Sequence, residues 1–308
     1  MKQVTFNSEG LALVGNLYYP SNFDAEKQYP AIVVSGSWTT VKEQMAGLYA
    51  AQLAEDEFIA LAFDFRNFGQ SEGEPRFYEN PAMKVVDIQN AVTYLGTLPE
   101  VDSERIGAFG VCAGAGYTLV AASQDARIKS VVVTASWLHD AEAVKMFYGG
   151  EAGVNAKITA AQAAKQNYAE HGVVEYIPSI SATDETAAMY GPYDYYLNPE
   201  RGAIPEWSAD KFAVMTWEDW LTFDPTRSAK DVKAATLMIH SDGAVLPTYA
   251  KQYFEKLGAS EKKLHWVETD LPSPFHQFNF YDQEAEVSLS VELAQKWFAS
   301  KMPERIAA

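Results

Sequence analysis

One short segment constrains the fold of this chain more than any other. An apolar run that starts at Arg105 ends in Gly110-Val111-Cys112-Ala113-Gly114, and small, apolar residues typical of a helix follow over 115–122. Glycines on both sides of Cys112 predict a tight strand-to-helix turn, because larger side chains there would collide with the adjoining strand and helix. The pattern is that of a nucleophile elbow, G-x-S-x-G, with sulfur in place of the hydroxyl. We therefore expect Cys112 to be presented at the turn.

Apolar strands and helices alternate on both sides of this turn. The expected strands are 31–35, 58–64, the run from Arg105, 128–135, 235–240 and 263–268, after an opening hairpin of 4–6 and 11–19; the expected helices are 42–55, 81–98, 115–122, 246–257 and 284–301. Strands that are apolar throughout, such as 31–35, are typical of a parallel sheet covered on both faces. The chain therefore predicts an α/β fold with a mostly parallel, doubly wound sheet and helices on both faces.

The alternation breaks between residues 137 and 223. This stretch holds four tryptophans, a tyrosine-rich segment over 190–196 and an alanine-rich helix from about 159 to 171. A long insertion with its own helices is a candidate cap over a pocket, and Trp137 and His139 at its start are candidates to contact a substrate. The alternative is that its aromatic residues only pack it onto the sheet or form a subunit interface. We expect core segments over 1–136 and 224–308 and a cap over 137–223.

Composition narrows the class of partner. Lys and Arg number 24 against 41 Asp and Glu, a formal net charge of -17, which leaves no basic face for nucleic acid. The single cysteine excludes an intrachain disulfide and a cysteine-based zinc cluster, as expected in a reducing compartment. Without a signal-peptide core or a run of about 18 apolar residues, a cytoplasmic protein that does not span a membrane is predicted. The sequence implies no metal or other cofactor and leaves a homodimer open.

A nucleophilic cysteine needs a neighbouring base or a positive local field. The helix that follows Cys112 supplies the field, because the free amides at its amino end favour an anion. Of the five histidines, only His276 lies in a long loop between the last strand and the last helix, at the carboxyl edge of the sheet. We therefore predict His276 as the base, with His139 as the alternative because it also follows a strand.

The third member of a triad orients the imidazole, and the oxyanion needs two amide donors. Asp242 follows the strand that ends at His240, which gives the chain order nucleophile, acid, histidine. Asp224 and Asp270 are weaker candidates because neither directly follows a buried strand. We predict the Ala113 amide as one oxyanion donor and the amide of Trp38 or Thr39 as the other.

These motifs together resemble the α/β-hydrolase superfamily, and within it a bacterial group related to dienelactone hydrolases and polyketide acyltransferase-like hydrolases. The resemblance covers nearly the whole chain apart from the expected cap and rests on residues 41–44, 63–76, the cysteine elbow, and His276 followed by Phe278 and Tyr281-Asp282. It implies that Cys112, Asp242 and His276 form a triad. It also implies that Glu43 and Arg66 lie near the pocket entrance as supporting residues.

The favoured function is hydrolysis of an ester, thioester or lactone of a small acyl substrate through an acyl-Cys112 intermediate. A thiol nucleophile suits activated acyl groups better than amides. An acyltransferase that passes the acyl group to an alcohol or amine is the alternative, favoured by a cap that excludes water. A binding protein that has kept the fold without turnover is the third hypothesis.

Overall fold

The core of the molecule is a single twisted sheet. The structure is a computed structural model that describes residues 1–55 and 57–304. Within these residues the strands of an eight-stranded sheet lie in the order β1 (Lys2–Ser8), β2 (Leu11–Tyr18), β4 (Ile59–Phe63), β3 (Tyr29–Ser35), β5 (Val101–Val111), β6 (Ile128–Thr134), β11 (Ala235–Ser241), β12 (Lys262–Val267). Pairing is antiparallel from β1 to β4 and parallel from β4 to β12, so the predicted mostly parallel sheet is confirmed.

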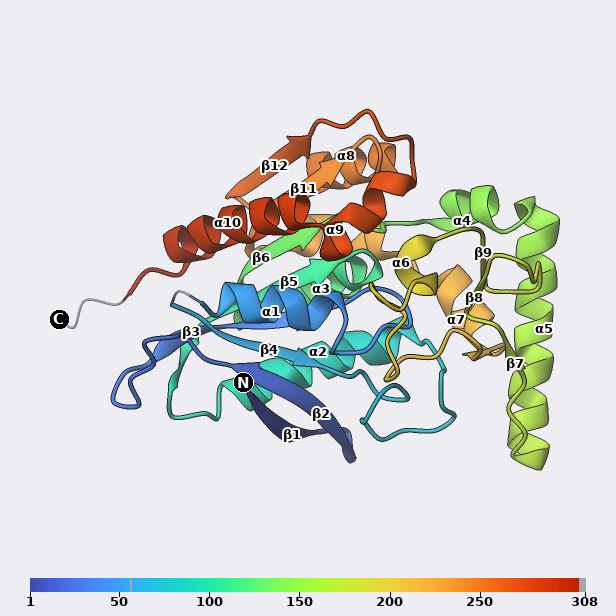
Figure 1. Cartoon of the computed structure of the whole chain (residues 1–308), viewed down its shortest axis with the longest axis horizontal. Coiled ribbons are helices and arrows are strands. Elements are labelled where there is room, and N and C mark those ends of the chain that lie inside the picture. The colour runs from blue at the N-terminus through green and yellow to red at the C-terminus, as the bar shows by residue number, and fades with distance from the viewer. Residues whose placement is uncertain (56, 305–308) are drawn as a thin grey trace.

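Helices cover both faces of the sheet, as expected for strands that are apolar on both sides (Figure 1). One layer contains α1 (Met45–Leu53) and α10 (Glu284–Lys301); the other contains α2 (Pro81–Leu95), α3 (Ala113–Gln124), the 3₁₀ helix η1 (Pro225–Asp231) and α8 (Pro247–Lys256). All residues of β3 and β4 are buried. Local sequence determines where α2 begins. The Asn80 side chain accepts a hydrogen bond from the Met83 amide, and Pro81 occupies the first helical position.

The segment between β6 and β11 lies beyond one end of the strands (Figure 1). It folds as α4 (Ala141–Phe147), α5 (Gly150–His171), β7 (Tyr176–Ile177) paired with β10 (Phe212–Ala213), β8 (Ile180–Ser181) paired with β9 (Met189–Tyr190), α6 (Asp194–Leu197) and α7 (Thr216–Thr222). Helix α5 begins well before the expected start near residue 159, directly after a turn in which Gly149 adopts a left-handed conformation. In the described parts of the chain, no helix has both the length and the apolar character needed to cross a membrane.

Candidate active site

Cys112 occupies the corner between β5 and α3. Its backbone has φ 56° and ψ -119°, a conformation that a residue with a side chain adopts only at an energetic cost. The flanking glycines are required by space: a Cβ on Gly110 would lie 2.7 Å from the Ala115 Cα, and one on Gly114 would lie 2.2 Å from the Gly36 carbonyl oxygen. The predicted elbow therefore forms for the predicted steric reason, and the side chain of Cys112 is held at the amino end of α3.

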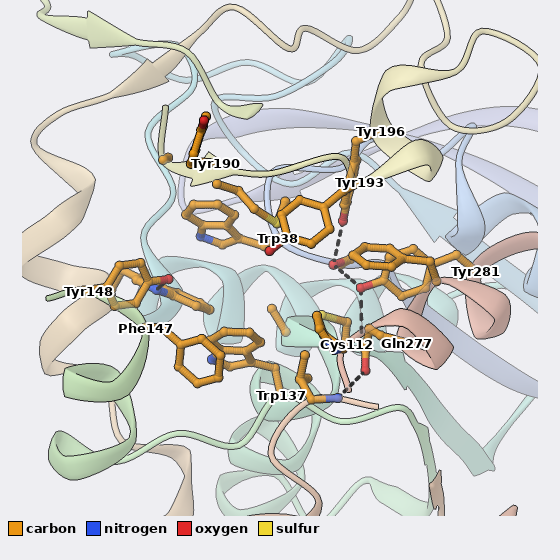
Figure 2. Close-up of a pocket in the computed structure, with 18 residues that line it drawn as sticks. Trp38, Cys112, Trp137, Phe147, Tyr148, Tyr190, Tyr193, Tyr196, Gln277 and Tyr281 are labelled. Carbon is orange, nitrogen blue, oxygen red and sulfur yellow. Dashed lines mark hydrogen bonds between the residues drawn. The ribbon is translucent and has the colours of Figure 1, made fainter. Parts of the chain in front are cut away.

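The side chain of Cys112 opens onto an aromatic cavity of about 150 Å³ at the carboxyl ends of the strands (Figure 2). Most of the wall comes from aromatic rings, namely Trp38, Trp137, Phe147, Tyr148, Tyr190, Tyr193, Tyr196, Trp220, Phe278 and Tyr281. Over the residues that the structure describes, no Asp, Glu, Lys, Arg or His side chain lines this cavity. The site is therefore largely aromatic and carries no charged side chain around its single thiol.

Polar groups on one side of the cavity surround the sulfur. The Tyr196 hydroxyl donates to Ser37 Oγ at 3.1 Å, Ser37 and Tyr281 hydroxyls lie 3.3 Å apart, and Gln277 Nε2 donates to the Tyr281 hydroxyl at 3.3 Å (Figure 2). Burial raises the pKa of the Cys112 thiol, and the hydrogen bonds from Ser37, Tyr281, the Ala113 amide and Gln277 lower it only in part. The net pKa lies above its ordinary value, so the thiol is protonated at neutral pH.

His276, the predicted base, does not line the cavity within the described chain, and other residues engage both of its ring nitrogens. It lies in the 3₁₀ helix η2 (Phe275–Phe278), where its Nδ1 is 2.7 Å from Ser241 Oγ and its Nε2 is 2.9 Å from Glu286 Oε1. A 3₁₀ helix turns about 120° per residue, so neighbours in sequence point in different directions. Gln277, the next residue, therefore lines the cavity while His276 is buried behind it.

Asp242 does not reach His276 either. Its side chain is 69% exposed and bonds Lys251 Nζ at 3.1 Å and Trp266 Nε1 at 3.1 Å. Successive side chains at the end of β11 point to opposite sides, so Ser241 turns inward to the imidazole and Asp242 turns outward. The hydrogen bond from Trp266 and the contact with Lys251 lower the pKa of Asp242. The predicted Cys112–His276–Asp242 triad is therefore not assembled in this structure.

Glu286 is the carboxylate that His276 contacts, and the sequence analysis did not single it out. It lies in the first turn of α10 and also accepts from Asn279 Nδ2 at 3.1 Å. Gln277 and Tyr281 were likewise missed as site residues. Their spacing of four residues, which places two side chains on one face of a helical segment, is the signal that was available.

The three amides predicted as oxyanion donors, those of Trp38, Thr39 and Ala113, differ in their availability. The Thr39 amide donates to Glu79 Oε2 at 2.9 Å, so in this structure it is not free to donate to an oxyanion. Glu79 is fully buried and also accepts from Lys84 Nζ at 2.7 Å and from the Tyr117 hydroxyl at 2.6 Å. This buried network fixes the loop after β3 and leaves Trp38 and Ala113, both of which line the cavity, as the candidate donors.

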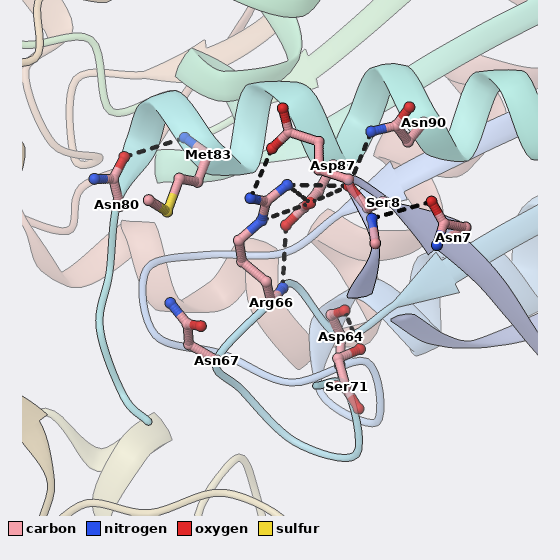
Figure 3. A network of polar contacts seen from close by, with 12 residues as sticks. Asn7, Ser8, Asp64, Arg66, Asn67, Ser71, Asn80, Met83, Asp87 and Asn90 are labelled. Carbon is pink, nitrogen blue, oxygen red and sulfur yellow. Dashed lines mark hydrogen bonds and ion pairs between the residues drawn. The ribbon is translucent and has the colours of Figure 1, made fainter. Parts of the chain in front are cut away.

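Arg66 and Glu43, which the resemblance places near the pocket entrance, do not line the cavity within the described chain. Arg66 is buried in a network with Asp87 and Ser8, with its Nη2 2.6 Å from Asp87 Oδ1, and it also pairs with Glu9 (Figure 3). These contacts tie the loop after β4 to α2 and β1. Glu43 pairs with the buried Lys42 Nζ at 2.6 Å. Both residues are held in structural ion pairs. From the sequence alone, a loop residue in such an ion pair cannot be distinguished from a loop residue that supports a pocket.

Trp137 and His139 form adjacent layers of the cavity wall. Trp137 lines the cavity, and its Nε1 donates to His139 Nδ1 at 2.8 Å. His139 Nε2 therefore carries the proton and donates to the Trp220 carbonyl oxygen at 3.0 Å. Burial lowers the pKa of His139 to about 4, which keeps it neutral. The alternative base of the sequence analysis is thus a buried support of the wall.

The order of the sheet and the strained elbow after β5 define an α/β hydrolase. The chain belongs to the family described as PET hydrolase-like, whose sequence profile matches residues 4–170. It is 30% identical over 304 residues to the uncharacterized protein YcjY of Escherichia coli (strain K12), covering 95% of each chain. The crystal structure of hypothetical protein PA2218 from Pseudomonas aeruginosa superposes with a TM-score of 0.84 at 28% identity, covering 97% of this chain and 93% of that one.

Fungal enzymes match a shorter stretch. Thiohydrolase aneE of Aspergillus aculeatus is 34% identical over 124 residues, which is 40% of this chain and 37% of the fungal protein. Polyketide transferase claH of Penicillium crustosum is 32% identical over 124 residues, which is 40% of each chain. The matches assign the superfamily and the family, and they leave the nucleophile and its partners to the geometry described above.

Proposed function

We propose that this α/β hydrolase accepts the acyl group of a small thioester on Cys112. The observation that supports this most directly is the position of the Cys112 thiol, which is held in a strained elbow at the amino end of α3 and opens onto an uncharged cavity. A nucleophile that is presented at a helix amino end, in an aromatic pocket without charged side chains, suits acyl transfer.

The lack of a base in the described cavity lining favours a thioester over an alkyl ester. In thiol–thioester exchange the Cys112 sulfur bonds the acyl carbon, the bond from that carbon to the leaving sulfur breaks, and the Cys112 proton ends on the leaving thiolate. Attacking and leaving groups then have similar proton affinities, so no separate acid or base is consumed. An alkoxide leaving group would need a general acid, which a neutral thiol surrounded by Tyr281 and Gln277 supplies poorly.

The negative charge that develops on the acyl oxygen requires prearranged donors. The amides of Ala113 and Trp38 are the candidates, since the Thr39 amide is committed to Glu79. We propose that residues 137–223 act as the cap that shields this charge from water, because they supply Trp137, Tyr148 and most of the other rings of the wall.

The acceptor of the second half-reaction is a separate question. Water needs deprotonation to attack an acyl-thioenzyme, whereas a thiol or an amine attacks without a strong base. We therefore propose transfer to such an acceptor as the main route, with hydrolysis as a slow side reaction. The name of the fungal thiohydrolase relative fits a thioester as the acyl donor.

A ligand-binding protein without turnover is the second candidate function. The observation that favours it is that His276 and Asp242 are engaged elsewhere, with Ser241 and Glu286 and with Lys251 and Trp266. Such a protein would hold a small ligand in the cavity and leave Cys112 unmodified.

The test is intact-mass analysis after incubation with N-acetylcysteamine thioesters of small acids. The wild-type chain should gain the mass of one acyl group on Cys112, and added thiol or amine should release it as the transfer product. Cys112→Ala should gain no mass and lose at least a thousandfold in turnover. Turnover by folded Cys112→Ala near the wild-type rate would disprove the acyl-cysteine route, and absence of both adduct and turnover in the wild type would favour the binding protein.

A further inference from the structure

Four side chains form a line of hydrogen bonds beside Cys112 (Figure 2). At one end, the Tyr196 hydroxyl of α6 donates to Ser37 Oγ at 3.1 Å, and at the other, Gln277 Nε2 of η2 donates to the Tyr281 hydroxyl at 3.3 Å. The Ser37 and Tyr281 hydroxyls between them lie 3.3 Å apart and are called the hydroxyl pair below. Each member of the hydroxyl pair therefore already accepts a hydrogen bond from outside the pair.

The direction of the hydrogen bond from Gln277 is fixed by the backbone around its amide group. Gln277 Oε1 accepts from the Val245 amide at 3.1 Å, and Nε2 donates to the Ala135 carbonyl oxygen at 2.7 Å. The second proton of Nε2 is the one that reaches Tyr281. Because an amide nitrogen accepts no hydrogen bond, Tyr281 cannot give its own proton to Gln277.

The hydroxyl pair has two protons, one on each oxygen. The contact between the two oxygens uses one of these protons, whichever oxygen donates. The other is left for Cys112, whose thiol hydrogen-bonds both Ser37 and Tyr281. Burial raises the pKa of Tyr281 well above its ordinary value, so this hydroxyl keeps its proton at neutral pH. The pair is therefore supplied with a proton to donate to the sulfur.

We propose that Ser37 and Tyr281 are catalytic residues that share the donation of one hydrogen bond to the Cys112 sulfur, an inference that rests on the proposed function. When an acceptor attacks the acyl carbon, the bond from that carbon to the Cys112 sulfur breaks. The electron pair of this bond stays on the sulfur, where the proton of the acceptor ends. A donor already placed at the sulfur stabilises the charge as it develops. Among the described residues, no charged side chain lines the cavity to do this.

The competing interpretation is that the hydroxyl pair only fills space between its neighbours. The two interpretations predict opposite effects when both oxygen atoms are removed. A pair that fills space would leave room for water, which lowers the pKa of a buried thiol and speeds its reactions. A pair that donates to the sulfur would leave the thiolate without its hydrogen bond and slow them.

Alkylation of Cys112 by iodoacetamide at pH 8, followed by intact-mass analysis, measures this difference. A hydrogen bond to a charged group changes an ionisation equilibrium about 10- to 100-fold. The more basic thiolate is the better nucleophile, which regains about the square root of that factor in rate. The double variant Ser37→Ala/Tyr281→Phe should therefore react about three- to tenfold more slowly than wild type. Each single variant keeps one hydroxyl that can donate and should lose less than about twofold.

Two further variants assign the effect to the hydroxyl pair. Ser37→Thr/Tyr281→Phe keeps one hydroxyl, so it should react at the rate of the single variant Tyr281→Phe. Tyr195→Phe is the matched control and should react as wild type does. Tyr195 is buried with its ring centroid 5.0 Å from that of Tyr281, and it does not line the cavity within the described chain. Near-ultraviolet circular dichroism checks that each variant folds.

The outcomes separate this inference from the proposed function, because alkylation requires no acyl transfer. A folded double variant that reacts as fast as wild type or faster would overturn the role of the hydroxyl pair. An equal loss of rate in Tyr195→Phe, or a loss in one single variant as large as in the double variant, would overturn it too. If alkylation follows the expected pattern but thioesters leave no acyl group on Cys112, the hydrogen bond to the sulfur is retained and the proposed function is rejected.

Discussion

Two polar clusters include neighbouring residues of the 3₁₀ helix η2, and they differ in whether they line the cavity. The first, around Cys112, Tyr281 and Gln277, faces the aromatic cavity. The second, around His276, Ser241 and Glu286, is closed to the cavity: within the described chain none of the three lines it, and both ring nitrogens of His276 are engaged by the other two residues. The groups that a catalytic triad would bring together are therefore separated. The thiol lies in the first, open cluster, and the imidazole and the carboxylate lie in the second, closed cluster.

The two clusters show that a histidine in the loop expected for a catalytic base need not act as one. The closed cluster joins the end of β11, the turn η2 and the first turn of α10 through the hydrogen bonds of one imidazole. Its Ser241, His276 and Glu286 have the residue types of a hydrolytic triad, but none of them lines the cavity within the described chain. We infer that this cluster stabilises the fold and that the open cluster carries the reactivity.

Among the tests that compare the two clusters, the largest expected effect is the pH dependence of Cys112 reactivity. Because burial raises the pKa of Cys112, its thiolate fraction should rise more steeply between pH 7 and 9 than that of a free thiol and should not level off in this range. A small thiol with a pKa of about 8.5 should gain only about 25-fold over this range and then level off. Iodoacetamide alkylation followed by mass spectrometry measures both, and a Cys112 rate that levels off below pH 8 would show that the open cluster contains an unrecognised base.

The next prediction introduces a base into the open cluster. Gln277→His places an imidazole beside Cys112, where the Ala135 carbonyl, which now accepts from Gln277 Nε2 at 2.7 Å, can accept Nδ1–H. General base assistance should raise the rates of thioester hydrolysis and of alkylation at pH 7 about 10- to 100-fold.

Gln277→Met, which is similar in size and has no strong donor, is the matched control and should show no gain. A folded Gln277→His protein that reacts no faster than wild type would mean that residue 277 does not face the thiol. Gln277 would then no longer be assigned to the cluster around Cys112.

Changing the closed cluster should alter stability more than reactivity. His276→Ala removes the hydrogen bonds to Ser241 and Glu286, so the free energy of unfolding should fall by about 2–3 kcal/mol. The rate of Cys112 acylation in the folded variant should stay within about twofold of wild type. Urea unfolding and intact-mass kinetics measure the two quantities; a loss of acylation of a hundredfold or more at unchanged stability would restore His276 as the base.

The same variant should show a defined pH dependence. Burial raises the pKa of Glu286, but hydrogen bonds from Asn279 and His276 outweigh it and bring the pKa below the ordinary value of 4.5. This stabilisation is fully present above pH 4.5 and is lost as the pH falls through the lowered folded-state pKa. The difference in unfolding free energy between wild type and His276→Ala should therefore shrink in acid.

Features set by local sequence could be predicted. The unbroken apolar run of β3 indicated a doubly covered parallel strand, and Gly110 and Gly114 indicated the elbow at Cys112. Trp137, singled out from its place at the start of the insertion, lines the cavity; its contact with a substrate stays a prediction. In each case the nearest neighbours in sequence determine the geometry.

Features set by long-range contacts could not be predicted. The Thr39 amide is withdrawn from the site by Glu79, 40 residues further along the chain, and nothing near Thr39 signals this. Arg66 looks like a pocket residue until Asp87 is seen to pair with it. His276 and Gln277 are adjacent, and only the phase of a short 3₁₀ turn decides which of them faces the cavity.

The smallest expected effect on acylation and stability is that of replacing Asp242. A small effect would show that this carboxylate is not the acid of a triad. In a triad, an acid-to-amide change at this position would cost several orders of magnitude in turnover. Here the carboxylate is exposed and pairs with Lys251 on the surface, so Asp242→Asn should leave the acylation rate unchanged and lower the free energy of unfolding by about 0.5 kcal/mol or less. Glu286→Gln is the matched comparison, because it alters the carboxylate that does contact His276 and should cost more stability. If Asp242→Asn instead reduced acylation more than tenfold, the outward orientation of this side chain would not describe the reactive state.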